Sequence, residues 1–412
     1  MYKTFFYHKE FLKKFTETIP SALFNCRLHL REILTFVSMR QKRVYVTVSS
    51  DLATDNRVHR TCTVLEGLGF QILLIGRKKK NSPPMPPRSY QVKRLRLGFE
   101  KGALFYAALN LRLFFLLLIN PYDYLFANDL DTLPAAYLAS RLRRKPLLYD
   151  SHELFTEVPE LVSRPRIQHF WLRIEQRILP HLKVMITVNE SIAAIFKSNY
   201  SIPVNVVRNV PQRQEQLYAL SREELNLKPT QKMLIIQGSG LNVQRGIEEA
   251  ILAMELIDDA VLFLVGDGDV IPSVKKIVAT KNLQEKVRFV GRLPYKQLLQ
   301  YTAAADLGLA LDKPLSLNYA LALPNKVFDY IQAQTPFVTS PLVEIQKLID
   351  RYDCGEVIQE VSPEALAQKI NTLCSNPERL AILKENCKKA AAVEHWDADK
   401  KVLAEVVERV FI

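Results

Sequence analysis

Cysteine is scarce in this sequence, and its distribution excludes two of its common uses. The 412 residues include five cysteines, Cys26, Cys62, Cys354, Cys374 and Cys387. Their spacing is not that of a metal site, and their odd number argues against a framework of disulfide bonds. We therefore expect a protein of the reducing cytoplasm.

A secretory signal and a clear transmembrane segment are also lacking. Lys and Arg occur throughout residues 1–40, which contain no compact apolar run before a cleavage site of small residues. Residues 103–119 are strongly apolar, but 17 residues that include Asn110 and Arg112 are short for a membrane span. We predict a helix there that is buried or partly faces a membrane, and burial is favoured.

Acidic residues are few in the first half of the chain. Residues 1–210 contain 32 Lys or Arg and 16 Asp or Glu, whereas residues 211–412 contain 24 and 27. A basic half can serve nucleic acid, an anionic membrane or an acidic substrate. Because we find no nucleic-acid-binding motif, an anionic membrane surface is the partner that we expect, and nucleic acid is not.

The first forty residues form a basic and aromatic extension. Phe11, Phe15 and Ile19 recur at helical spacing among lysines, a pattern typical of a helix that lies on a membrane. A helix docked on its own domain would show the same pattern. A third possibility is that translation starts at Met39, just before an apolar run that is typical of a first strand.

From residue 44 onward, short apolar runs alternate with longer helical segments, which predicts parallel sheets covered by helices. We expect strands at 44–48, 72–75, 124–127, 147–149, 184–188 and 205–207, and a second series at 233–236, 261–265, 287–290, 307–311, 337–339 and 357–358. The sequence thus predicts an α/β protein with two doubly wound, Rossmann-like domains. Between the second and third of these strands, residues 77–88 read as an exposed loop that can touch lipid or acceptor.

The polar stretch between the two series sets the domain boundaries. We place the extension at 1–40, the N-terminal domain at 41–208, the linker at 209–231, the C-terminal domain at 232–390 and a closing helix at 391–412. Ligands of open parallel sheets bind beyond the carboxyl ends of the strands, and two facing domains form a cleft there. The active site should therefore lie between the halves.

The stretch 323–340 reads as a loop, a helix and a strand that together suit a nucleotide. Pro324 fits the first helical position with Asn325 as a cap beside it, so the free N–H groups would form an anion site. Lys326 would hold a diphosphate, and Asp329, on the same side of the helix, would accept hydroxyls of a ribose. An ordinary amphipathic helix with a surface Lys and Asp is the alternative.

The loop Gly238-Ser239-Gly240 is a second candidate for phosphate binding. Its small residues let backbone N–H groups approach a diphosphate, and Arg245 nearby could clamp it. A tight turn would have the same composition.

Two Asp-x-Asp triplets raise the question of a metal site. We assign Asp129-Leu130-Asp131 to a helix start and Asp267-Gly268-Asp269 to a turn, and predict no metal.

His152 follows the fourth expected strand, where it would project into the cleft. Acid–base catalysis, a hydrogen bond to a substrate hydroxyl and a structural contact to Asp150 or Glu153 are all open to it.

These motifs as a set resemble those of the group-one glycosyltransferases. The segments that carry the resemblance are 150–155, 209–211, 245–246, 265–268 and 325–330. The resemblance, which extends from about residue 44 to the C-terminus, implies the GT-B fold and a retaining, metal-independent transferase without a cofactor. It also implies a nucleoside diphosphate sugar as donor and a hydroxyl acceptor, part of a glycolipid or cell-surface polysaccharide precursor.

Carried over by position, the resemblance assigns roles to individual residues. Arg245 and Lys326 would grip the diphosphate and act in catalysis together with His152, which would lie near the transferred sugar. Arg57 and Glu153 would serve the acceptor side, and Arg57 would contact a phosphate. The donor-binding residues would be Gly238, Ser239, Gly240, Arg245, Asn325, Lys326 and Asp329.

The sequence departs from the family pattern at two donor-side positions. Leu321 stands where the first of two carboxylates is usual, and Ser239 replaces a common basic residue. A GT-B epimerase and a non-catalytic sugar-nucleotide binder therefore stay open as alternatives. For a transferase we expect a cytoplasmic location on the inner face of the plasma membrane.

Overall fold

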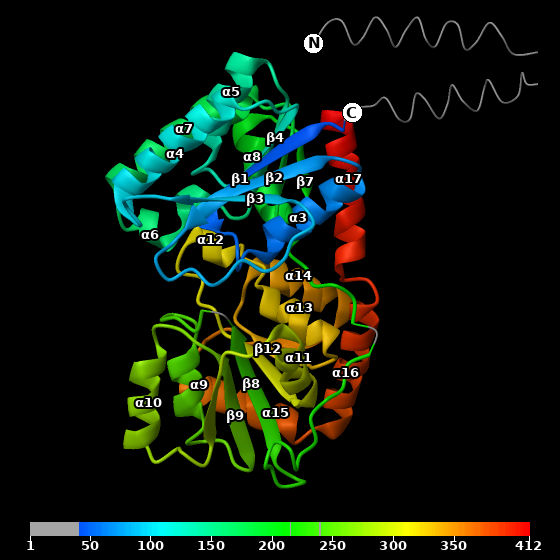
Figure 1. Cartoon of the computed structure of the whole chain (residues 1–412). Helices are drawn as coiled ribbons and strands as arrows, with labels where there is room; N and C mark the ends of the chain where they lie inside the picture. Colours follow the sequence, from blue (N-terminus) through cyan, green and yellow to red (C-terminus); the bar gives the residue numbers. More distant parts are fainter. Residues whose placement is uncertain (1–40, 215, 239) are drawn as a thin grey trace, which may run out of the picture. The chain divides into compact units, whose positions relative to one another are not determined.

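The computed structural model describes residues 41–214, 216–238 and 240–412 (Figure 1). The predicted helix around Phe11 and Phe15 and the residue Cys26 lie outside the described residues. Arg43–Ile412 form a compact unit, and this unit contains two parallel sheets. The α/β class with two doubly wound domains is thus confirmed.

The first sheet has the strand order β3-β2-β1-β4-β5-β6-β7, with all neighbours parallel. Its strands are β1 Arg43–Asp51, β2 Gln71–Lys78, β3 Gln91–Arg96, β4 Tyr124–Asn128, β5 Leu147–Ser151, β6 Met185–Thr187 and β7 Val204–Val206. The sequence analysis missed β3, because this edge strand alternates charged residues and buries only Leu95.

Helices cover both faces of the first sheet. They are α3 Asn56–Gly67, α4 Gly102–Ile119, α5 Leu133–Arg143, α6 Pro159–Val162, α7 Pro165–Ile178 and α8 Glu190–Tyr200. One apolar cluster joins the sheet to α4, α5, α7 and α8, and another joins its opposite face to α3. Asp55 and Asn189 begin α3 and α8 by accepting a hydrogen bond from the backbone N–H three residues on.

The second sheet repeats this plan with the order β10-β9-β8-β11-β12-β13. Its strands are β8 Lys232–Gly238, β9 Ala260–Gly266, β10 Val287–Gly291, β11 Leu307–Ala310, β12 Phe337–Thr339 and β13 Gly355–Val357, and its helices are α9 Ile247–Ala253, α10 Ile271–Thr280, α11 Tyr295–Ala304, α12 Leu317–Ala320, α13 Asn325–Gln332, α14 Val343–Tyr352, α15 Pro363–Cys374 and α16 Pro377–Ala391. In both sheets the strand order reverses beside the first strand of the series, which is where ligands of such folds bind.

The last helix, α17 Trp396–Phe411, returns to the first half of the chain. It packs on α3, and the Phe411 ring stacks on Tyr124 with centroids 4.5 Å apart. Asp399 of α17 also pairs with Arg208, with Oδ2 and Nη2 2.9 Å apart.

Helix α4 differs from the sequence expectation that favoured burial. Its inner stripe, which includes Leu109 and Leu113, is fully buried, but Leu111 is 61% and Ile119 is 75% exposed. Among the described residues α4 is the one helix long and apolar enough to cross a membrane, and a single helix of this kind is weak evidence for a span. The expectation was wrong because the sheet covers only one side of a helix that is apolar all round.

Candidate functional site

Helix α13 presents its N-terminus without a side-chain cap in the described part of the chain. Pro324 is the residue before the helix and Asn325, which is exposed, is its first residue. The sequence analysis had placed Pro324 inside the helix and Asn325 as its cap. Both assignments were wrong by one position, because the ψ of Pro324 is 136° and therefore extended. The free N–H groups remain available to an anion.

Lys326 and Arg245 meet on one carboxylate, that of Asp312. Lys326 Nζ lies 2.8 Å from Asp312 Oδ2, and Arg245 Nη1 donates to Asp312 Oδ1 over 2.8 Å. Lys326 and Asp312 are buried, whereas the Arg245 side chain is 29% exposed. Two cations held by one carboxylate leave a net positive site at the start of α13, as a diphosphate requires.

Asp329 is also buried, so the alternative of a plain surface helix is wrong. Tyr295 donates from its hydroxyl to Asp329 Oδ1 over 2.7 Å, and Gln237 Nε2 donates to Oδ2 over 3.1 Å. Burial raises the pKa of the Asp329 carboxyl to about 6, although these two hydrogen bonds oppose the shift. Each oxygen keeps one lone pair for a further donor.

The loop after β8 runs against the loop after β9. Ser239, predicted to bind the donor, lies outside the described residues, and Gly238 and Gly240 flank it. A Cβ on Gly266 would lie 1.9 Å from the Gly238 carbonyl oxygen, and the φ of Gly266 is +144°. Only glycine fits at position 266, which lets the two loops approach at the carboxyl edge of the sheet.

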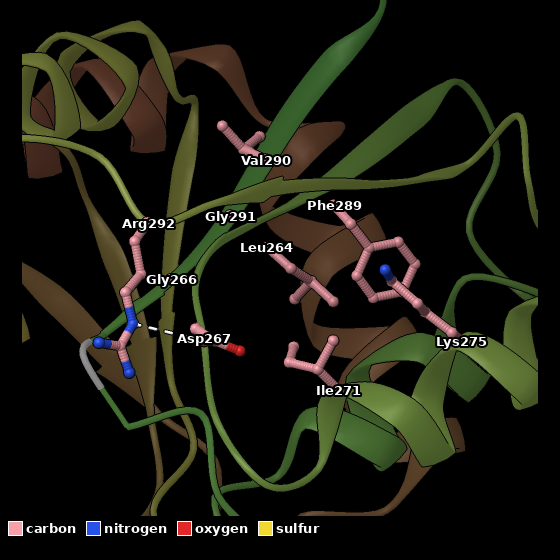
Figure 2. Close-up of a pocket in the computed structure, with 9 residues that line it drawn as sticks. All are labelled: Leu264, Gly266, Asp267, Ile271, Lys275, Phe289, Val290, Gly291 and Arg292. Atoms are coloured by element: carbon pink, nitrogen blue, oxygen red, sulfur yellow. Dashed lines mark ion pairs between the residues drawn. The ribbon is translucent and has the colours of Figure 1, made fainter. Parts of the chain in front are cut away.

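A cavity of about 330 Å³ opens beside these loops, between β9, β10 and α10 (Figure 2). Leu264, Ile271 and Phe289 give it apolar walls, and Arg292 and Asp267 lie at its side with Nε and Oδ2 3.5 Å apart. Its volume is near the lower end of typical ligand pockets. The sequence analysis did not identify this cavity.

On the first sheet, His152 has an acceptor beside each ring nitrogen. Nδ1 lies 3.2 Å from Asp129 Oδ2, and Nε2 lies 3.1 Å from Asn128 Oδ1 and 3.4 Å from Asp150 Oδ2. Asn128 points this oxygen at the ring because its amide nitrogen donates to the Thr47 carbonyl. Burial alone would lower the pKa of His152, but Asp129 and Asp150 raise it to about 10. An imidazolium that donates from both nitrogens is not a general base.

Arg57 is a structural residue, contrary to the predicted phosphate contact. Its guanidinium is 7% exposed and donates to both oxygens of Asp150, at 2.7 Å and 3.2 Å, and to the Val207 carbonyl at 2.8 Å. Burial favours the protonated form of Asp150, but Arg57 and His152 hold the pKa of this carboxyl below its usual value. Arg57 thereby fixes the carboxylate that orients His152.

Glu153 lies where a loop of the first half touches the second half. Asn318, on α12, accepts from the Leu154 N–H over 2.8 Å, and its amide nitrogen lies 3.4 Å from Glu153 Oε2. The amide nitrogen of Asn189 likewise donates to the Leu321 carbonyl over 2.8 Å. Burial, reinforced by Asp129, raises the pKa of Glu153 to about 7. Of the two residues expected on the acceptor side, Glu153 thus contacts the segment that leads into α13, whereas Arg57 does not.

The first Asp-x-Asp triplet was predicted to begin a helix, and this prediction was wrong. Thr132 precedes α5, and Asp129, with a φ of +60°, accepts from the His152 backbone N–H over 3.0 Å. In the part of the chain that the structure describes, no group of three or more His, Cys, Asp or Glu side chains is arranged to hold a metal ion.

Family models match two adjoining parts of this chain. Residues 54–211 match the model of Glycosyltransferase Family 4, and residues 219–390 match that of Glycosyl transferases group 1. The first match covers β2 to β7, and the second covers β8 to β13. The predicted resemblance to the group-one glycosyltransferases is thus confirmed, with the group 1 model matching the second half of the chain.

Solved structures share the fold of this chain at low sequence identity. Sucrose-phosphate synthase from Thermosynechococcus elongatus is 17% identical, with a TM-score of 0.72 over 90% of this chain and 99% of the other. HepE of Anabaena in complex with UDP-glucose is 16% identical, with a TM-score of 0.66 over 89% of this chain and 99% of the other. A UDP-N-acetylglucosamine 2-epimerase is 10% identical, with a TM-score of 0.59 over 90% of this chain and 96% of the other. These likenesses establish the GT-B fold, which transferases and epimerases share. No protein with a curated description matches the chain in sequence.

Asp312, the carboxylate that joins Arg245 and Lys326, was not predicted from the sequence. A signal was present, because Asp312 comes two residues after β11 ends, as His152 comes directly after β5. Polar residues at the carboxyl ends of parallel strands are candidates for a site on this ground alone.

Proposed function

We propose that this protein is a retaining, metal-independent glycosyltransferase that moves a hexose from a nucleoside diphosphate sugar to a hydroxyl. The meeting of Arg245 and Lys326 on Asp312 beside the start of α13 carries the proposal. A diphosphate leaving group gains negative charge as the sugar departs, and fixed cations stabilise that charge best when they need no rearrangement.

The proposed donor would lie along the carboxyl edge of the second sheet. Its diphosphate would contact Arg245, Lys326 and the N–H groups at Asn325. Its ribose would use the free lone pairs of Asp329, and its base would suit the cavity beside Asp267. HepE, which shares the fold, binds UDP-glucose, and this supports a nucleotide sugar as the donor.

His152 would act on the substrate as a fixed positive charge. If both ring nitrogens hold a proton, as the raised pKa favours, His152 would stabilise negative charge nearby and would not accept a proton. The proton of the acceptor hydroxyl would pass to the leaving phosphate, as the family resemblance implies. No protein nucleophile is then required, and Glu153 would contact the acceptor.

The acceptor that we propose is a hydroxyl of a glycolipid or a cell-surface polysaccharide precursor, used on the inner face of the plasma membrane. The excess of Lys and Arg in residues 1–210 supports a partner that is anionic. Such an acceptor would bring the enzyme to the membrane as a peripheral protein.

A panel of nucleoside diphosphate sugars, incubated with purified protein and membrane lipid extract, tests the reaction. Release of nucleoside diphosphate together with a sugar-labelled lipid or glycan is the expected result. A new sugar nucleotide without release of diphosphate would identify an epimerase. Tight binding of a donor with neither product would identify a non-catalytic binder.

A further inference from the structure

Helices α4, α5 and α7 lie together on one side of the first sheet (Figure 1), and we call their outer surface the α4–α5–α7 face. Large apolar side chains that are at least half exposed there are Leu104, Leu111, Phe115 and Ile119 of α4 and Leu138 and Leu142 of α5. Phe170 of α7 is 58% exposed. Apolar side chains gathered in this way on a water-facing surface mark an interaction site.

The three helices that form the face contact one another. Helix α4 packs on α5, and α5 contacts α7. The Trp171 ring lies between Phe170 and Tyr106 of α4, with centroids 5.6 Å and 5.2 Å away. Aromatic contacts thus join α7 to α4.

Hydrogen bonds hold α4 in place on its inner side. Asn110 donates to the Asp131 carbonyl over 2.7 Å and accepts from the Ala135 N–H over 3.1 Å. Arg143 of α5 donates to the carbonyls of Leu118 and Asn120 at the end of α4, over 2.8 Å and 2.6 Å. Crossing a membrane would break these bonds, so α4 is suited to lie on a surface.

The charge of the face is of one sign. Helices α4, α5 and α7, which the structure describes in full, contain a single carboxylate, Glu175, which is 4% exposed and accepts from Tyr200. The exposed charged side chains of these helices are Arg112, Arg141, Arg166, Arg173 and Arg177. Arginine beside exposed Leu and Phe complements lipid phosphate beside acyl chains. A second copy of the chain would bring like charges together.

We propose that the α4–α5–α7 face docks on an anionic lipid bilayer, with the outer stripe of α4 inserted and the arginines on lipid phosphates. Helix α4 is linked to the His152 side of the site, because Asn110 on its inner side donates to the Asp131 carbonyl and Asp129 of the same loop pairs with His152. We expect a lipid-borne hydroxyl to reach the site from this side of the domain. The docking itself does not depend on the proposed reaction.

Co-sedimentation of the full chain with vesicles tests this surface. Vesicles of phosphatidylcholine with phosphatidylglycerol are compared with phosphatidylcholine alone, at low and high salt. We expect binding that favours the anionic vesicles and weakens with salt. The variant L111Q/F115Q should weaken binding about tenfold or more, because two inserted apolar side chains are lost. The variant R166Q/R173Q should reduce the preference for anionic vesicles.

A matched control replaces two apolar residues outside the face that are equally exposed. Leu256 and Ile382 are each 51% exposed, and L256Q/I382Q should bind vesicles as the wild type does. Thermal melting confirms that each variant is folded. The inference is overturned if L111Q/F115Q binds as well as the control, or if F11Q/F15Q alone removes binding. It is also overturned if sedimentation velocity shows a dimer that L111Q/F115Q dissociates while vesicles bind neither form.

Discussion

Lys326 and Asp312 form a buried ion pair in which Nζ and Oδ2 lie 2.8 Å apart. Each side chain is 8% exposed, and Asp312 also accepts a hydrogen bond from Arg245. One carboxylate thus positions two cations before a donor arrives. This arrangement links the stability of the second sheet to its proposed chemistry, and the two contributions can be separated by substitution.

Replacing Lys326 should impair both folding stability and catalysis. In K326Q the Asp312 carboxylate loses one of its two cations but keeps Arg245, so the loss in the free energy of unfolding should be smaller than the about 3–5 kcal/mol that an unpaired buried charge costs. The double variant K326Q/D312N removes both charges and should recover part of the melting temperature. Its kcat/KM should nevertheless remain about a hundredfold or more below wild type, because the charge at the leaving group is gone. Kinetics and thermal melts measure both quantities.

The neighbouring buried residue Val327 supplies the control. V327A shortens an apolar contact and should lower the free energy of unfolding by about 1–3 kcal/mol without a selective loss of kcat/KM. Equal kcat/KM for folded K326Q/D312N and V327A would show that the ion pair is purely structural.

Asp329→Asn should raise KM for the donor more than it lowers kcat. A ribose changes little during transfer, so the lost interaction contributes equally to substrate and transition state. A charge-assisted hydrogen bond contributes about 1.5–3 kcal/mol, or about ten- to a hundredfold. Initial rates over a range of donor concentrations separate the two constants, and an unchanged KM would remove Asp329 from the ribose site.

The contribution of His152 to the free energy of unfolding should be largest near pH 6 and should decrease as the pH rises. Burial lowers its pKa, but Asp129 and Asp150 raise it overall to about 10, above the ordinary 6.5. A raised pKa contributes stability that is complete below pH 6.5 and is lost as pH rises through about 10. We therefore expect the difference in the free energy of unfolding between wild type and H152Q to decrease as the pH rises from 6.5 to about 10. Denaturant titrations from pH 6 to 9.5 measure it, and a constant difference would contradict the imidazolium.

Removal of divalent metal should leave transfer intact. We assign the diphosphate to Arg245 and Lys326, and Asp267 and Asp269 to loop contacts, in which Asp269 accepts from the Val243 N–H over 3.1 Å. Activity in EDTA should equal activity in magnesium. Loss of activity that magnesium or manganese restores would show that a metal carries the diphosphate.

The sequence by itself determined the class of fold, the order of its elements and the segments that lead to the site. Twelve short apolar runs predicted strands, and each of them overlaps an observed strand. Lys326 was predicted from the helix start at Pro324 and Asn325, and Arg245 from its place beside the small residues Gly238-Ser239-Gly240; the family resemblance then assigned both to the diphosphate. These signals are local, since helix period, strand period and turn residues each depend on a few neighbouring positions.

Only the tertiary structure decided which charges neutralise one another and which apolar surfaces stay exposed. From the sequence we expected Arg57 to contact a phosphate. Its partner is instead Asp150, which is 93 residues away and is brought to it by the strand order of the first sheet. Arg245 reaches Asp312 across 67 residues in the same way. Helix α4 is apolar on all sides, so its period cannot show which stripe the sheet covers. Pairing and burial depend on which strand ends and helices meet in space, and no local pattern records that.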